Sequence, residues 1–237
     1  MATESLAETV KKLQYQVEKL TAIAECNRLM GRYAYLLAQH RMEDFFNLFA
    51  KHSKTRVYLG EMGYWEGPDA PRRAWGMSDV REGASQPQRR EENMAGLLYL
   101  HPNETPCIEV AGDLQTAKGV WITDGIETGR NSVTQQLDPH WAWGAYGIDF
   151  IKENGQWKFW HFHIYRLFAP HYNTSWVEWE ADAPPSQFPP VDGVRRMPKR
   201  KADGPAVDDY PYRANEVFVW KPDPPEPYET FDKTTSY

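Results

Sequence analysis

The feature that most constrains this fold is an Asn154-Gly155 pair between two aromatic segments, residues 141–152 and 156–168. Asn and Gly both tolerate positive φ, so the pair fits the centre of a tight turn and is the strongest short-range hairpin signal. Two further strand-like segments precede it, at 107–113 and 116–122. The sequence therefore predicts a mostly antiparallel sheet in this part of the chain.

The N-terminal segment predicts an amphipathic helix. Its apolar residues recur at alternating spacings of four and three, a pattern typical of one helical face. They are Leu6, Val10, Leu13, Val17, Leu20 and Ala24. We expect this face to pack on its own domain or on a neighbouring subunit, and the helix to bend near Thr21 and reach about Gln39. A short helix should follow over residues 42–50, which makes the fold class α+β.

The C-terminal segment has a different composition. Twelve of the 18 prolines lie from Pro170 onward. Proline favours extended backbone and cannot donate ladder hydrogen bonds. Aromatic residues also recur there, whereas a disordered tail would be poor in them. We therefore expect an N-terminal amphipathic helix (1–21), a pocket domain (22–170) and an extended Pro-rich arm (171–237). The arm would wrap its own domain or, the interpretation we favour, a partner subunit in a homo-oligomer, either a dimer or a trimer.

Composition excludes several classes of function. The net charge is −6 and the one basic cluster, residues 195–201, lies in the Pro-rich segment, so no basic face for nucleic acid is expected. Two cysteines form neither a disulfide framework nor a metal motif. No apolar run is long enough to span a membrane, and the first residues lack a signal-peptide core. We expect a cytoplasmic protein with no nucleic-acid or membrane partner.

The stretch from Met30 to Trp65 joins a Tyr- and Leu-rich helix, an aromatic segment at 42–50 and a strand that ends in Val57-Tyr58-Leu59. This order of elements resembles the SnoaL-like, nuclear transport factor two-like superfamily, in particular its scytalone dehydratase-like and lignin diarylpropane lyase-like branch. The resemblance extends to Phe168. It implies a strongly curved sheet wrapped around helices as a cone with a deep pocket, and chemistry without a cofactor.

The resemblance also implies catalytic residues. Tyr58 matches a first-strand tyrosine and His101 a histidine before the second strand; a phenol can donate a hydrogen bond and an imidazole can exchange protons near neutral pH. The alternatives are an interfacial tyrosine and a histidine that caps its loop. The family's helix aspartate has no counterpart, because Ala38-Gln39-His40 stands at its position. Asp124 or Glu127 would then supply a carboxylate from a strand.

The last expected strand offers a polar wall. His161, His163 and Tyr165 alternate and so share one face, which is the concave face if Lys158 points to solvent. The residues that alternate with them, Trp160, Phe162 and Ile164, would then face outward and form an apolar surface for a partner. Two histidines could bind a metal, but zinc needs three or four ligands, so we expect none. Other expected substrate contacts are Tyr33, Arg56, Trp121 and Trp143, while Trp75 and Met77 would cap the pocket.

These residues favour one leading function. It is a cofactor-independent lyase that dehydrates a hydroxylated aromatic small molecule, or releases formaldehyde from it, through a quinone methide. A lignin-derived two-ring compound would suit the high aromatic content, 14%. The sequence has no glycine-rich phosphate loop or nucleophile elbow, which argues against nucleotide cofactors and covalent catalysis. The alternatives are a SnoaL-like polyketide cyclase or isomerase and a non-catalytic binding or assembly module.

Overall fold

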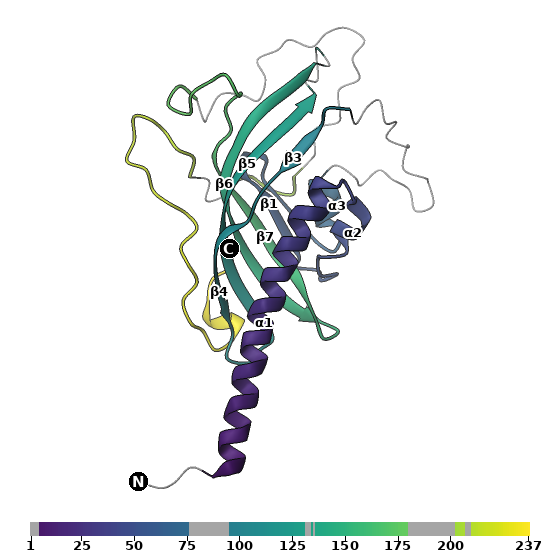
Figure 1. Cartoon of the computed structure of the whole chain (residues 1–237), viewed down its shortest axis with the longest axis vertical. Helices are drawn as coiled ribbons and strands as arrows, with labels where there is room; N and C mark the ends of the chain where they lie inside the picture. Colours follow the sequence, from purple (N-terminus) through teal and green to yellow (C-terminus); the bar gives the residue numbers. More distant parts are fainter. Residues whose placement is uncertain (1–4, 76–94, 131–133, 135, 180–201, 207–209) are drawn as a thin grey trace.

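In the computed structural model, a long helix is followed by a seven-stranded sheet (Figure 1). The structure describes residues 5–75, 95–130, 134, 136–179, 202–206 and 210–237. The helical elements are α1 (Leu6–Ala38), α2 (Met42–Phe46), η1 (Gly60–Met62), α3 (Ala70–Ala74) and η2 (Phe231–Lys233). The strands are β1 (Arg56–Leu59), β2 (Tyr64–Glu66), β3 (Leu98–Leu100), β4 (Glu104–Val110), β5 (Thr116–Arg130), β6 (Leu137–Glu153) and β7 (Gln156–Phe168).

The sheet is mostly antiparallel, as predicted. Its order is β2-β1-β7-β6-β5-β3, with β4 also paired to β5, and among the described strands only β1 and β7 run parallel. The β6–β7 hairpin turns at Asn154 and Gly155, whose φ angles are 52° and 75°. These positive values are the ones that the Asn-Gly pair predicts for a tight turn. The α+β class and the curved sheet with the long helix α1 across one face are confirmed (Figure 1).

Helix α1 begins with a capping box. The Ser5 side chain accepts a hydrogen bond from the Glu8 amide, and the Glu8 carboxylate accepts one from the Ser5 amide at 2.9 Å, which satisfies two amides that the helix itself leaves unpaired. The helix runs unbroken through Thr21, where we expected a bend. Its second half crosses one face of the sheet, while its first turns project beyond the sheet (Figure 1). None of the described helices is long and apolar enough to cross a membrane.

Aromatic side chains fill the space between α1, α2 and the sheet. Tyr33 of α1 packs against Phe162 of β7, with ring centroids 4.9 Å apart, and Phe49 and Phe159 continue the cluster at 5.1 Å. All four side chains are buried. Such rings contribute large apolar areas and favour tilted or edge-on contacts. The cluster fixes the helix on the sheet, and we call this inner surface of the sheet the concave face.

A β-bulge in β7 changes which side chains reach the concave face. Asp149 pairs with His161 and Phe150 pairs with Phe159, so Trp160 is an extra residue in β7. A strand's side chains alternate between faces, and one extra residue reverses the alternation beyond it. The expected orientation is therefore wrong: Phe162 enters the core, and His161 lies on the opposite face.

The described part of the C-terminal segment lies against its own sheet. The amides of Gly112 and Asp113 donate to the carbonyls of Tyr228 and Glu229 at 2.9 and 3.1 Å. Lys118 of β5 donates to the carbonyl of Thr235 at 2.7 Å. The final residues thus cover the face of the sheet that points away from α1, which we call the outer face. Met77 and most of the irregular segment expected before the sheet lie outside the described residues.

Candidate active site

A cavity of about 350 Å³ opens between the C-terminal end of α1 and the concave face. Aromatic and aliphatic side chains make up most of its wall, and several ionisable groups also line it. The lining residues are Tyr33, Leu37, His40, Met42, Leu59, Met62, Trp75, Tyr99, His101, Thr123, Glu127, Ala142, Trp143, Gly144, Tyr146, Ile164 and Arg166. A concave, largely apolar cavity with a few converging polar groups is the usual form of a small-molecule site.

A histidine–carboxylate pair is the main polar feature of this cavity. His101 Nε2 lies 2.9 Å from Glu127 Oε1. The β3–β5 register brings the two residues together, because Tyr99 pairs with Glu127 and His101 follows two residues later. Gly125 makes room for the imidazole: a Cβ at that position would lie 2.4 Å from His101 Nδ1. The side chain of Glu127 keeps 39% of its area exposed against 11% for His101, so the carboxylate is the more accessible member.

The surroundings of Glu127 keep it ionised. Burial alone would raise the pKa of this carboxyl group, but the hydrogen bond with His101 and the nearby charges of His101 and Arg166 outweigh burial. The pKa of Glu127 therefore lies below its ordinary value. Because the carboxylate can only accept, His101 Nε2 carries the proton of their hydrogen bond. The Nδ1 atom is buried and has no partner among the described residues.

Two tyrosines form a second polar group in the cavity. The hydroxyls of Tyr33 and Tyr146 lie 3.4 Å apart, and both side chains are buried. Burial raises the pKa of Tyr33 well above the ordinary value of a phenol, and the neighbouring Tyr146 raises it further. Burial also raises the pKa of Tyr146. Both phenols thus stay protonated at neutral pH and can donate a hydrogen bond to an oxygen in the cavity.

The comparison with known families identifies the fold family. A family model described as a SnoaL-like domain matches residues 18–163. The chain belongs to the SnoaL-like family. No functionally curated protein matches the sequence.

Solved structures similar to this SnoaL-like protein have low sequence identity. A candidate scytalone dehydratase from Novosphingobium aromaticivorans DSM 12444 is 19% identical, covers 68% of this chain and 93% of its own, and has a TM-score of 0.51. The LinA-type3 hexachlorocyclohexane dehydrochlorinase from Novosphingobium barchaimii LL02 is 10% identical, covers 67% and 94%, and has a TM-score of 0.48. At 19% identity, the likeness to the first of these structures concerns the fold alone.

Of the ten candidate residues from the sequence, the cavity of this SnoaL-like protein brings together four: Tyr33, His101, Glu127 and Trp143. Trp75, expected as a cap, also lines it. Trp121 does not: its ring is buried in the core, where its indole N–H donates to Asn27 Oδ1 at 3.2 Å. Asp124 is also outside, because Thr123 and Glu127 point inward and strand alternation turns Asp124 to the opposite face.

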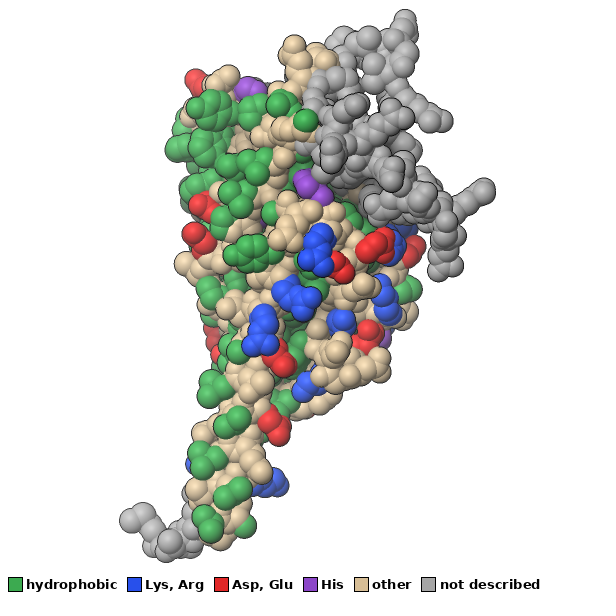
Figure 2. Space-filling model, turned by 45° about the vertical axis from the view of Figure 1, so that its right-hand side comes forward, with side chains coloured by type: hydrophobic (Ala, Val, Ile, Leu, Met, Phe, Trp, Pro, Cys, Tyr) green, Lys and Arg blue, Asp and Glu red, His purple; other side chains and the backbone are tan. Residues whose placement is uncertain are grey.

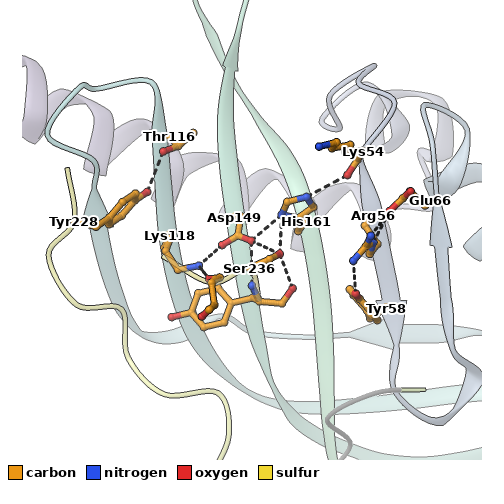
Figure 3. Close-up of polar contacts among 12 residues, drawn as sticks. Lys54, Arg56, Tyr58, Glu66, Thr116, Lys118, Asp149, His161, Tyr228 and Ser236 are labelled. Carbon is orange, nitrogen blue, oxygen red and sulfur yellow. Dashed lines mark hydrogen bonds and ion pairs between the residues drawn. The ribbon is translucent and has the colours of Figure 1, made fainter. Parts of the chain in front are cut away.

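Tyr58 and Arg56 of β1 also lie on the outer face, away from the cavity (Figure 3). Arg56 binds the carboxylate of Glu66 and donates to the Tyr58 hydroxyl at 2.9 Å. Tyr58 stacks on His163, with ring centroids 4.5 Å apart. The expected placement of both residues at the pocket is therefore wrong, since Val57 and Leu59 are the β1 residues that point inward.

His161 belongs to a sealed polar cluster on the outer face (Figure 3). Its Nδ1 lies 2.8 Å from Asp149 Oδ2, and its Nε2 donates to the Lys54 carbonyl at 3.1 Å. Asp149 also binds Lys118 at 2.6 Å and accepts from Ser236 Oγ at 2.8 Å. Ser236 and Asp149 both contact Nδ1. A nucleophilic triad would instead use the two ring nitrogens separately, so this Ser–His–Asp set is structural.

Tyr146, Arg166 and His40, which were not predicted from the sequence, also line the cavity. Arg166 lies in β7 beyond the bulge, so its inward orientation depends on that extra residue. His40 has a φ of 55° where α1 ends, a left-handed conformation that re-aims the chain. Alternation along β6 was the one available signal, since Tyr146, Ile148 and Phe150 all point inward.

The described residues give no metal centre. No three or more His, Cys, Asp or Glu side chains in this part of the chain are arranged to hold a metal ion. His161 and His163, the pair we considered for a metal, point to the outer face, where His163 is stacked between Tyr58 and Tyr165.

Proposed function

We propose that this protein is a cofactor-free lyase that acts on a hydroxylated aromatic small molecule by general acid–base catalysis. The observation that carries the proposal is the His101–Glu127 pair at the wall of a cavity that is otherwise lined mostly by aromatic and aliphatic side chains. A positioned acid–base group of this kind contributes typically about 10²–10⁴-fold to rate. Glu127 exchanges protons with the substrate, and His101 orients the carboxylate through Nε2–H.

The size and lining of the cavity favour a two-ring substrate of the lignin-derived kind. A cavity of about 150 Å³ is enough to hold benzene, and this one has about 350 Å³. Trp75, Tyr99 and Trp143 offer faces and edges for stacking against aromatic rings. The protonated hydroxyls of Tyr33 and Tyr146 can donate to a phenolic or carbonyl oxygen. The presence of these converging polar groups argues against a module that only binds or assembles.

The chemistry needs only proton transfers. A phenol with a hydroxyl on the para benzylic carbon loses its phenolic proton and that hydroxyl, together one water, and becomes a quinone methide. Removal of the proton from a neighbouring CH₂OH group then breaks the carbon–carbon bond and releases formaldehyde, and the bonding pair restores the aromatic ring as a phenolate. Removal of a carbon-bound proton instead gives a dehydrated product. Glu127 accepts these protons in turn: it returns the first to the departing hydroxide, which leaves as water, and the second to the phenolate, which restores both the phenol and the free carboxylate.

A substrate screen tests the proposal. One-ring and two-ring phenolic benzylic alcohols are incubated with the protein, and mass spectrometry follows the loss of 1 water or of water plus formaldehyde. The matched control is the methyl ether of each phenol, which cannot form a quinone methide. We expect turnover of free phenols only. Equal conversion of the ethers would overturn the quinone-methide route, and no conversion of any phenol would overturn the proposed activity.

A further inference from the structure

Helix α1 has two apolar faces, and only one of them packs on its own domain. The domain side carries Ala22 and Cys26, which are buried, and Tyr15, whose hydroxyl donates to the Gly112 carbonyl at 3.0 Å. Lys19 on the same side lies 3.6 Å from the Glu109 carboxylate. At 100° per residue, the Leu6–Ala24 stripe lies almost opposite these contacts.

The second apolar face is exposed along the projecting part of the helix. Figure 2 shows hydrophobic side chains on this projecting segment. The exposed fractions are 81% for Leu6, 44% for Val10, 55% for Leu13, 61% for Val17 and 66% for Leu20. Single exposed apolar residues are ordinary, but a continuous stripe of them marks an interaction surface.

We propose that residues 6–24 of α1 pair with the same segment of a second copy, as a parallel, in-register two-stranded coiled coil. The stripe repeats every seven residues, with Val10 and Val17 at the a positions and leucines at the d positions. β-Branched residues at a with Leu at d favour parallel dimers. The register ends after Ala24, because the next d position is Asn27, whose side chain accepts the Trp121 hydrogen bond.

The flanking positions point to a second copy as the occupant. Charges at the e and g positions normally select the partner of a coiled coil. Here all of these positions are uncharged, so two identical helices meet without like-charge repulsion. They are Ala7, Thr9, Gln14, Gln16, Thr21 and Ile23. Since the domain contacts lie on the opposite side of the helix, the two domains diverge from the seam and do not obstruct it.

The helix is already formed before pairing. Its N-terminus carries the Ser5–Glu8 capping box, and its second half is anchored in the core. Short isolated helices are marginally stable because nucleation is unfavourable. Here the packed second half of α1 has already nucleated the helix. Because the stripe covers fewer than three full heptads, we expect a reversible, concentration-dependent dimer.

Sedimentation velocity of the full chain over a wide range of concentration tests the dimer. We expect a monomer–dimer equilibrium that Leu13→Glu with Leu20→Glu shifts to monomer at every concentration. Lys11→Glu with Lys12→Glu places two glutamates on the same segment but off the stripe, and should keep the dimer. Circular dichroism checks that all variants are folded. A wild-type monomer at all concentrations, or a dimer unaffected by the stripe variant, would overturn the proposal.

Cysteine cross-linking tests the parallel register. In a Cys107→Ser background, which removes the exposed cysteine, Leu13→Cys should form a disulfide-linked dimer under mild oxidation. Residues at one d position face each other in a parallel pair. Lys12→Cys, one residue away and off the seam, is the matched control and should stay unlinked. Equal linking of both variants, or none at position 13, contradicts the in-register arrangement.

Discussion

The two faces of the sheet each carry a histidine–carboxylate pair, and their surroundings differ. On the concave face, His101–Glu127 borders a cavity and the carboxylate remains partly exposed. On the outer face, His161–Asp149 has no exposed carboxylate area, both ring nitrogens are engaged, and the C-terminal residues cover it. An imidazole and a carboxylate therefore form an accessible pair on the concave face and a buried, structural pair on the outer face. Access to the carboxylate from the cavity, and not the pairing itself, distinguishes the pair that we propose to be reactive from the structural one.

The outer pair belongs to a row of ionisable residues across the sheet. Arg56 pairs with Glu66 and His161, His161 with Asp149, and Asp149 with Lys118. Arg56 has Glu66 beside it and Lys118 has Asp149. Lys118 also lies 4.1 Å from the ring centre of Tyr237. Buried charges are tolerated when they are paired and hydrogen-bonded. The row explains why so many apparent catalytic residues of the sequence are structural.

The largest expected effect is on stability, from Asp149→Asn on the outer face. Asp149 is fully buried and binds Lys118, whose side chain is 5% exposed. Removing one partner of a buried pair leaves the other charge uncompensated and costs about 3–5 kcal/mol of unfolding free energy. Urea denaturation measures this loss. Turnover by the protein that remains folded should be unchanged. If Glu127→Gln lost stability while Asp149→Asn kept it, the structural pair would be the one on the concave face, which contradicts the assignment.

The matched change on the concave face should affect turnover instead. Glu127→Gln keeps the size of the side chain and removes its capacity to accept a proton as a base. We expect kcat to fall by roughly 100-fold or more, about 2.7 kcal/mol, with an unfolding free energy within about 1 kcal/mol of wild type. His101→Gln should lower kcat similarly. Steady-state kinetics on a substrate from the phenol screen provides the measurement, and wild-type rates in both variants would exclude this pair from catalysis.

An effect that is absent at neutral pH and develops on acidification should appear as pH dependence of stability, through His163 on the outer face. Burial lowers the pKa of His163 to about 3, although Asp149 opposes the shift. In the unfolded chain a histidine takes up its proton near pH 6.5. Between these values the unfolded state binds more protons, so stability is complete above about pH 6.5 and falls by about 1.4 kcal/mol per unit as the pH decreases.

His163→Gln checks the source of this pH dependence. Urea unfolding between neutral pH and about pH 4.5 should show a shallower loss of stability in this variant than in the wild type. His171→Gln is the control, because its side chain is 40% exposed. Equal slopes in wild type and His163→Gln would show that His163 is not held neutral by the fold.

Several parts of the fold and site followed from local sequence. The Asn154-Gly155 turn and the helical stripe were predictable because turn geometry and side-chain periodicity are local properties. The family resemblance added His101 and its pocket position. Glu127 was one of two replacement carboxylates considered, and the β3–β5 register was needed to choose it over Asp124. Tyr58, by contrast, was selected only because its position matches the first-strand tyrosine of the family, and its side chain points to the outer face.

The sequence by itself determined the kinds of elements, the sheet-forming segments and the residue types available for proton transfer. The tertiary structure decided which of those residues share a cavity. The physical reason is the period of two along a strand: the single extra residue at Trp160 turns His161 and His163 outward and Arg166 inward. Nothing in the alternation of β7 marks that bulge, because it arises from how β7 pairs with β6. The pairing of strands therefore places His101 and Glu127 at the cavity. It places His161 and His163 on the outer face, where the C-terminal segment lies.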